Sequence, residues 1–431
     1  MEEGRVLDYS ANQQSAIIKN NNVNEVFVLD ENRLTARTWA EVNLGAIAHN
    51  IQQTRLRIGK DVRLMAVVKA NAYGHGAIEV ARVARKAGAD ALGVATLEEA
   101  LELRHDGKLD VPILVLGYTP AQEASVAAMS RITLTIVSPE HAKAVQSEMA
   151  RFAGGSSADE NNGSSNTSDD GSDKRSIPTL LVHLKIDTGM GRLGVTSLTE
   201  LDSMVNALSG SNVRIEGAFT HFAQADASDK KHANLQLGLV KTYFERLASR
   251  LNRQDLIFHS SNSAAIIDMH DSYFSMVRLG ISLYGVYPSD DVEKGNLPLR
   301  QAMHLFTRVA HVKEVESGTT ISYGSTFVTD RRMKIATLPI GYADGLLRIL
   351  SNRGFMLLKG QRCKVIGRIC MDQTMIDVSA VPDVHVDDIV TVFDEQTLPL
   401  LSKLAETIPY ELLCAVSRRV PRVYRGEETL V

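Results

Sequence analysis

Between about residues 45 and 290 the chain repeats one unit, a short continuous apolar run followed by a longer amphipathic stretch. The runs are Leu64–Val68, Ala91–Ala95, Ile113–Gly117, Thr133–Val137, Leu180–Leu184, Ile215–Thr220, Ile257–His259 and Met276–Leu279. Runs of this length are typical of parallel strands that are covered on both faces. The stretch 77–88 has helical spacing and ends in Gly88, a residue favoured at helix ends. Eight such units predict an α/β fold, the (β/α)8 TIM-type barrel.

After about residue 295 the pattern changes to alternating segments rich in Val, Ile and Thr, separated by glycines and polar turn residues. We therefore expect a barrel over residues 45–295 and a second, mainly antiparallel β domain over 296–431. Residues 35–44 also alternate, and we expect them to add a strand to the second domain. Residues 1–34 are polar and Asn-rich, and 154–176 are of low complexity. They predict a flexible N-terminal extension and a disordered insertion in the barrel.

Charge and cysteine spacing exclude several classes of partner. The net charge of −4 leaves no dominant basic face, which argues against a nucleic-acid partner. Cys363, Cys370 and Cys414 show neither zinc-ligand nor disulfide spacing, so we expect reduced thiols and no metal. The N-terminus lacks a signal-peptide pattern, and no apolar stretch approaches the ~20 residues that cross a bilayer. These features predict a cytoplasmic protein with no membrane partner.

Lys69 follows directly on the apolar run Leu64–Val68, in the stretch VVKANAYGHG. Other polar side chains at the ends of later runs are Lys185, His221, Ser263 and Arg278. In a parallel barrel all these positions lie at the same end, where active sites are found. A lysine in a dry barrel mouth has a lowered pKa and becomes a nucleophile towards aldehydes. This chemistry fits a pyridoxal phosphate enzyme, and it also fits a class I aldolase.

The loops after the last two runs are candidates for a phosphate site, because barrels commonly bind phosphate there. Ser263 lies in the first of these loops, and Gly280 and Ile281 lie in the second. Taken singly, Ser263 is explained as a helix N-cap and Gly280 as a turn residue. Taken with Lys69, the hydroxyl and the close backbone approach at glycine favour a phosphate.

For each further candidate residue, a structural explanation is possible as well as a functional one. Arg192 lies in the glycine-rich stretch LKIDTGMGRLG. The stretch either presents the guanidinium fork to a carboxylate or phenolate, or forms a turn with an arginine at the surface. Arg278 is a donor only and needs a buried acceptor, such as an unprotonated pyridine nitrogen. His221 and His259 are equally explained as core histidines. Tyr323 is a general acid or base if cations lower its pKa, or a tyrosine packed at a domain edge.

Together these stretches resemble the alanine racemase family, the fold-type III pyridoxal phosphate enzymes. VVKANAYGHG is similar to the family's cofactor-attachment signature. KIDTGMGRLG, SYGSTF, GYADG and GRICMDQ match four further family blocks in the family's order. The resemblance covers nearly the whole chain from about residue 36, apart from 154–176. It implies a homodimeric racemase that uses pyridoxal 5′-phosphate as its cofactor.

The resemblance also implies roles for single residues at the cofactor. Lys69 would hold pyridoxal phosphate as a Schiff base and act as one catalytic base. Tyr323, contributed by the partner subunit, would be the base on the opposite face. The remaining cofactor-binding positions would be Tyr73, Ser263, Gly280 and Ile281 at the phosphate, Arg278 at the pyridine nitrogen, Arg192 at the phenolic oxygen, and His221.

Other positions match the family's substrate site. Arg192 would bind the substrate carboxylate, with Met371 contributed in trans, and Tyr342 matches a gate on the substrate path. Lys185 matches a position that is often carbamylated in the family. At Arg418 many members have a tyrosine at the entrance, so the entrance here differs in polarity.

The activity that the resemblance implies is the interconversion of L-alanine and D-alanine by a two-base mechanism, supplying D-alanine. A racemase of broader range, acting on serine or basic amino acids, is the alternative within the same chemistry. A fold-type III decarboxylase fits the blocks around Tyr323 and Met371 less well. A non-catalytic pyridoxal phosphate carrier is the alternative from another class, and such carriers resemble the barrel alone.

Overall fold

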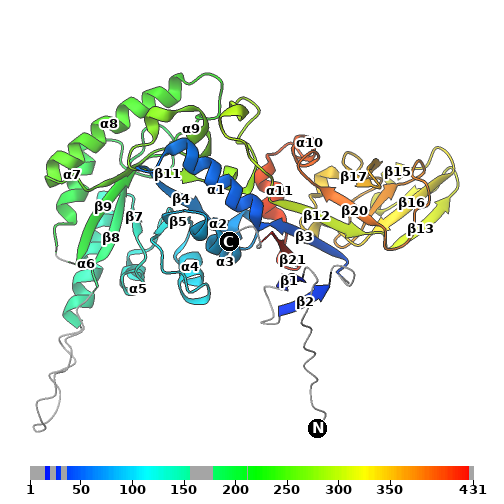
Figure 1. Cartoon of the computed structure of the whole chain (residues 1–431), viewed down its shortest axis with the longest axis horizontal. Helices are drawn as coiled ribbons and strands as arrows, with labels where there is room; N and C mark the ends of the chain where they lie inside the picture. The colour runs from blue at the N-terminus through cyan, green and yellow to red at the C-terminus, as the bar shows by residue number, and fades with distance from the viewer. Residues whose placement is uncertain (1–14, 20–25, 31–35, 156–177, 211, 427–431) are drawn as a thin grey trace, which may run out of the picture. The chain divides into compact units, whose positions relative to one another are not determined.

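The computed structural model describes residues 15–19, 26–30, 36–155, 178–210 and 212–426. The chain divides into two compact units. We call Ala46–Arg300 the barrel unit, and Met1–Gly45 with Gln301–Thr429 the β unit (Figure 1).

The barrel unit contains eight parallel strands, and each predicted apolar run overlaps one of them. The strands are β4 (Arg63–Val67), β5 (Ala91–Val94), β6 (Ile113–Val115), β7 (Leu134–Ile136), β8 (Leu180–Lys185), β9 (Val213–Phe219), β10 (Ile257–His259) and β11 (Met276–Leu279). They pair in the order β6-β5-β4-β11-β10-β9-β8-β7. A parallel bridge between Leu114 and Thr133 joins the two end strands, so the ring is nearly closed. The barrel prediction is confirmed.

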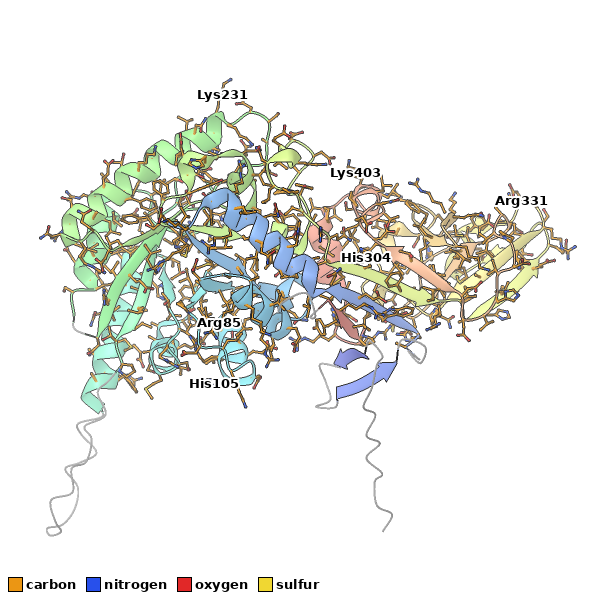
Figure 2. The ribbon with its side chains drawn as sticks, in the orientation of Figure 1. Arg85, His105, Lys231, His304, Arg331 and Lys403 are labelled. Atoms are coloured by element: carbon orange, nitrogen blue, oxygen red, sulfur yellow. The ribbon has the colours of Figure 1, made fainter. Side chains whose placement is uncertain are left out.

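Helices follow the strands, as the amphipathic stretches predicted. They are α1 (Leu44–Ile58), α2 (Lys69–Tyr73), α3 (Ala77–Lys86), α4 (Leu97–Leu101), α5 (Ala124–Met129), α6 (Pro139–Gly155), α7 (Leu198–Ala207), α8 (Lys231–Leu251) and α9 (Ser263–Asp268). In α3 the buried residues Ala77, Val80, Ala81 and Ala84 recur at helical spacing, which places one apolar stripe against the barrel. The exposed side chain of Lys231, at the start of α8, reaches outward in Figure 2.

The β unit is built mainly from antiparallel strands, as predicted. Its large sheet has the order β18-β17-β20-β12-β3-β21-β1-β2, in which only β3 and β21 pair in parallel among the described strands. These strands are β1 (Ser15–Lys19), β2 (Val26–Asp30), β3 (Thr38–Asn43), β12 (Met303–Arg308), β17 (Phe355–Leu358), β18 (Gln361–Lys364), β20 (Ile389–Phe393) and β21 (Arg422–Arg425). The smaller elements are β13 (His311–Val315), β14 (Thr320–Ile321), β15 (Phe327–Val328), β16 (Met333–Leu338), β19 (Thr374–Asp377), α10 (Leu398–Leu404) and α11 (Pro409–Ala415).

Two segments that we expected to be flexible or disordered are described only in part. Within residues 1–34, where we expected a flexible extension, β1 and β2 pair with each other, and β1 also pairs with β21. Backbone pairing to an existing sheet edge orders these short apolar segments, and local sequence does not reveal such pairing. The rest of that extension lies outside the described residues. So does the insertion expected at 154–176, apart from Gly154 and Gly155 at the end of α6.

Two features are absent from the described residues. In that part of the chain, no helix combines the length and apolar character needed to cross a bilayer. Over the same ranges, no three His, Cys, Asp or Glu side chains are grouped so that they could hold a metal ion.

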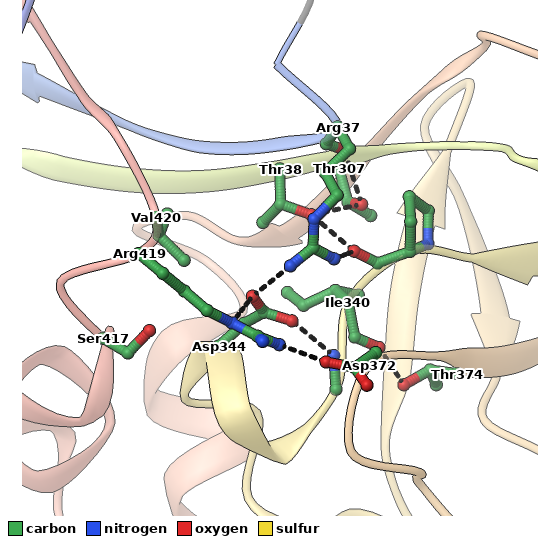
Figure 3. Close-up of polar contacts among 12 residues, drawn as sticks. Arg37, Thr38, Thr307, Ile340, Asp344, Asp372, Thr374, Ser417, Arg419 and Val420 are labelled. Atoms are coloured by element: carbon green, nitrogen blue, oxygen red, sulfur yellow. Dashed lines mark hydrogen bonds and ion pairs between the residues drawn. The ribbon is translucent and has the colours of Figure 1, made fainter. Parts of the chain in front are cut away.

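A buried carboxylate organises the loops of the β unit (Figure 3). Asp344 is fully buried, and its Oδ1 accepts hydrogen bonds from Arg37 Nη2 and Arg419 Nε, both at 2.8 Å. Its Oδ2 accepts from the backbone N–H of Gly341 at 2.9 Å. Arg419 also reaches Asp372 with Nη2, at 2.7 Å. One buried charge therefore ties the loop after β16 to β3 and to the segment before β21.

Asp344→Asn should lower the free energy of unfolding by roughly 2–3 kcal/mol, because two arginines lose their shared anion, although both are partly exposed. Asp372→Asn is the matched control: its side chain is 56% exposed, and its loss should cost less than about 1 kcal/mol. Urea denaturation of the two variants measures the difference. Equal shifts in midpoint would contradict the prediction.

Candidate active site

Lys69 lies just beyond the end of β4 and begins α2, a turn with unusual backbone geometry. The four residues that follow the lysine all have φ of 51° or 52°, in the left-handed region. The turn is closed by a hydrogen bond from Gly74 N–H to Ala70 O, at 3.0 Å. Each non-glycine residue in this conformation costs roughly 1–2 kcal/mol. Strain of this size persists only where the surroundings hold it, and it is common at functional sites.

His75 is the first of the side chains that hold this turn. It is fully buried, and its Nδ1 lies 3.0 Å from the carbonyl oxygens of both Ala72 and Tyr73. Because both partners are acceptors, Nδ1 carries the proton and donates. The ring also packs against Tyr284, with centroids 4.4 Å apart. The sequence had left His75 without a role, and the structure makes it a brace for the turn.

Glu99 and Asn71 tie the same turn to its neighbours. Glu99, on α4, accepts hydrogen bonds from the backbone N–H groups of Ala70 at 2.7 Å and Ala95 at 2.8 Å. Asn71 Oδ1 accepts from the N–H of Ala77, at 2.9 Å, where α3 begins. Sequence reasoning missed Glu99, because an acidic residue in the first turn of a helix is ordinarily explained by the helix dipole.

Tyr73, Ser263 and Gly280 converge at the ends of neighbouring strands. Ser263 Oγ accepts from the N–H groups of Gly280 at 3.0 Å and Ser282 at 3.3 Å. A Cβ added to Gly280 would lie 3.4 Å from Tyr73 Oη and 3.6 Å from Ser263 Oγ. Both hydroxyl groups therefore border the space that the missing side chain leaves open. Ile281 begins the adjoining 3-10 helix, whose first N–H groups have no partner inside the helix.

The loop that carries Arg192 is folded around one carboxylate. Asp187 Oδ1 accepts from the N–H groups of Gly189, Met190 and Gly191 at 2.8–3.1 Å, and Oδ2 accepts from the N–H of Arg192 at 2.8 Å. Burial opposes ionisation of Asp187, but these four hydrogen bonds outweigh it and lower its pKa. The loop is thus held by an anion, and the side chain of Arg192 is exposed.

Arg278 is a buried cation in the wall of the barrel, on β11. Its Nη2 donates to the carbonyl oxygens of Thr220 at 2.8 Å and Ser260 at 2.9 Å. A guanidinium has no acceptor, so it also donates to Nδ1 of His259 at 2.8 Å and to Nδ1 of His221 at 3.2 Å. Burial, and then the charge of Arg192, lower the pKa of Arg278 to about 9. Arg278 remains charged at neutral pH.

Burial and this buried charge together lower the pKa values of neighbouring groups. Burial first, and then the charges of Arg278, Arg192, Lys185 and Lys69, hold the pKa of His221 well below its ordinary value. Burial and Arg278 also lower the pKa of Lys185 to about 7. Lys185 Nζ donates to the carbonyl of Ile186 at 2.8 Å. At neutral pH a large fraction of Lys185 is therefore an uncharged amine.

Three of the segments matched by the resemblance meet in the β unit. Tyr323 opens a 3-10 helix after β14, and the preceding Ser322 donates from Oγ to Arg368 O at 2.6 Å. Tyr342 N–H donates to Cys370 O, and Ala343 N–H to Met371 O, each at 3.0 Å. The Tyr323, Tyr342 and Met371 side chains are 71%, 43% and 53% exposed.

The chain matches two family descriptions over most of its length. Residues 42–288 match "Alanine racemase, N-terminal domain", and residues 302–424 match "Alanine racemase, C-terminal domain". The chain is 45% identical over 394 residues to the alanine racemase of Desulforamulus reducens, covering 90% of this chain and 99% of that protein. The chain belongs to the alanine racemase family.

Solved structures of this family of isomerases agree in fold. The alanine racemase of Clostridium difficile 630 is 38% identical, covers 92% of this chain and 97% of its own, and has a TM-score of 0.81. The enzyme of Bartonella henselae, solved with covalently bound pyridoxal phosphate, is 26% identical with a TM-score of 0.76. It covers 90% of this chain and 100% of its own.

The residues suggested by the sequence divide between the two units. In the barrel unit lie Lys69, Tyr73, Lys185, Arg192, His221, Ser263, Arg278, Gly280 and Ile281. These residues lie at or just beyond the carboxyl ends of the barrel strands. Hydrogen bonds and mutual electrostatic effects among them show that they are neighbours. Tyr323, Tyr342, Met371 and Arg418 belong to the β unit, where Arg418 is exposed.

Proposed function

We propose that this chain interconverts L-alanine and D-alanine with pyridoxal 5′-phosphate bound at the barrel mouth, supplying D-alanine. The observation that carries this proposal is the strained turn that holds Lys69 beside the Tyr73–Ser263–Gly280 cradle. The family relatives named as alanine racemases favour alanine over serine or a basic amino acid as substrate. The β unit and its exposed tyrosines argue against a carrier that consists of a barrel alone.

The residues present fit the cofactor. The hydroxyls of Tyr73 and Ser263, with the backbone at Gly280 and Ile281, supply neutral donors of the kind that bind phosphate. Lys69 would hold the aldehyde carbon, and His221 would contact the ring. When bound, the cofactor supplies the electron sink that stabilises negative charge at the substrate α-carbon.

Three cationic residues would orient the cofactor and the substrate. Arg278 can only donate hydrogen bonds, so a ring nitrogen facing it would remain an unprotonated acceptor. Arg192 would bind the phenolic oxygen and the substrate carboxylate through its bidentate fork. Lys185, close to both arginines, would become an anion on carbamylation and hold Arg192 in place. This change of sign would also relieve the mutual repulsion of three buried or crowded cations.

Racemisation needs a proton removed from one face of the α-carbon and returned to the other. Lys69 Nζ would serve one face, and Tyr323 Oη the opposite face. Tyr323 and Met371 would come from the partner subunit of a homodimer, with Tyr342 on the substrate path. Their exposure in the β unit supports a role at such an interface. The charge of Arg418 would make the entrance more polar than a tyrosine does.

Gly280→Ala should weaken pyridoxal phosphate binding at least about tenfold, because its Cβ would enter the space between the two hydroxyls. The φ of Gly280 is −95°, so the substitution brings no left-handed strain. Gly238→Ala, where no atom lies within 4 Å of the new Cβ, is the matched control. Absorbance titration of cofactor-free protein measures both affinities. Equal affinities would argue against this cradle.

Tyr323→Phe should slow α-proton exchange on L-alanine by at least about a hundredfold, since it removes one of two proton-transfer groups. Exchange on D-alanine should fall much less, because Lys69 serves that face. Exchange in deuterated water, followed by NMR, measures both directions. Tyr243→Phe on α8 is a control that leaves both rates unchanged. Equal losses for the two enantiomers would contradict the assignment of faces, and no exchange in the unmodified protein would refute the proposed activity.

Lys185 should carry a carbamate, formed when its neutral amine attacks carbon dioxide and releases a proton. Because burial and Arg278 lower the pKa of Lys185 to about 7, the modified fraction should rise between pH 6 and 8 at constant dissolved carbon dioxide. Carbon-13 NMR with labelled bicarbonate measures it. Lys185→Met should abolish the signal, and Lys241→Met, which removes an exposed lysine of α8, should retain it. A signal that survives Lys185→Met would contradict the prediction.

A further inference from the structure

A line of hydrogen bonds runs through the barrel interior away from Arg278. Arg278 Nη1 lies 2.8 Å from His259 Nδ1, and His259 Nε2 lies 2.9 Å from His183 Nδ1. His183 Nε2 in turn lies 3.3 Å from Glu216 Oε2. The four residues come from β11, β10, β8 and β9, and both histidines are buried. The proposed reaction uses only the first of these four residues.

One arrangement of protons satisfies every link. A guanidinium only donates, so His259 Nδ1 must accept and the ring proton must be on Nε2. That proton is donated to His183 Nδ1, which places the His183 proton on Nε2, facing the carboxylate of Glu216. Burial and Arg278 hold the pKa of His259 well below its ordinary value, so this ring is neutral. The hydrogen bond from His183 lowers the pKa of Glu216, which keeps the terminal acceptor ionised.

The far end of this line opens into a cavity of about 340 Å³. His183 and Glu216 line it, together with Arg63, Ala91, Ile113, Ile257 and Met276, the first residues of β4, β5, β6, β10 and β11. The cavity therefore lies at the amino-terminal end of the strands, opposite the end that carries Lys69. The Glu216 side chain is 31% exposed. The line thus connects a partly hydrated carboxylate to the buried cation of the proposed cofactor site.

We propose that Glu216 is a positioning residue that acts through His183 and His259 to orient Arg278, an inference that rests on the proposed function. Without the terminal acceptor, the N–H of His183 loses its partner, and only Arg278 then favours the Nε2-protonated tautomers, so the opposite tautomers become populated. In those tautomers His259 Nδ1 carries a proton and faces the Arg278 N–H group, donor against donor. Arg278 would lose that bond while keeping its bonds to Thr220 O and Ser260 O, so its direction would change and its burial would not.

The tautomers themselves can be measured without cofactor. In cofactor-free protein labelled with nitrogen-15 histidine, His183 and His259 should both appear as neutral rings protonated at Nε2. Assignment uses the signals lost in His183→Gln and His259→Gln. Glu216→Ala should change these two signals, and Glu216→Gln, which keeps an acceptor oxygen, should restore them. Nδ1-protonated rings in the unmodified protein would overturn the proposal whether or not the protein racemises alanine.

The loaded enzyme supplies the second measurement. Glu216→Ala should lower kcat in both directions by about tenfold, the rate equivalent of one lost hydrogen bond, with KM for alanine nearly unchanged. It should also shift the visible absorption of the bound cofactor. Glu216→Gln should restore most of the lost kcat and most of the original absorption. Arg214→Gln, on the same strand and ion-paired with Asp255 at the surface, is the matched control. Unchanged kcat and absorption in Glu216→Ala would overturn the proposal, as would equal losses in Ala and Gln variants.

Discussion

The burial of a permanent positive charge, on Arg278, is the constraint on which the proposed site depends. Such a group is tolerated inside a barrel only when acceptors surround it, and the ends of β9 and β10 supply carbonyl oxygens and two histidine nitrogens. Burial first, and then the charge of Arg278, lower the pKa values of His221 and His259 and bring the pKa of Lys185 to about 7. The buried arginine thus contributes to the protonation state of three neighbours.

The second constraint is the left-handed turn after Lys69. Four consecutive residues at positive φ store strain, which His75 and Glu99 offset by pairing with the turn's carbonyl and N–H groups, while Asn71 ties the turn to the start of α3. The turn sends Tyr73 towards Ser263 and Gly280 instead of continuing along the barrel wall. The same hydrogen-bonded turn therefore begins with Lys69 and ends with Tyr73, one of the residues of the proposed phosphate cradle.

Much of the fold could be predicted because its signals are local. A continuous apolar run is explained by burial on both faces, and each of the eight runs overlaps a strand. Lys69, Arg278 and Ser263 could be selected because polar groups at the ends of such runs share one end of the barrel. Glu99, His183 and Glu216 could not be selected, because each is an ordinary residue in its own segment. Their importance comes from partners that are distant in sequence, such as Ala70 for Glu99 and His259 for His183.

The sequence by itself determined the barrel, the antiparallel second unit and the residue types available at the strand ends. Burial periodicity and glycine placement can be recognised from the residues of a single segment. Only the tertiary structure decided that His75 braces a strained turn, that β1 pairs with β21, and that a line of hydrogen bonds connects Arg278 to Glu216. Hydrogen-bond direction depends on which donor meets which acceptor across the barrel. That pairing exists only once the strands have closed into a ring.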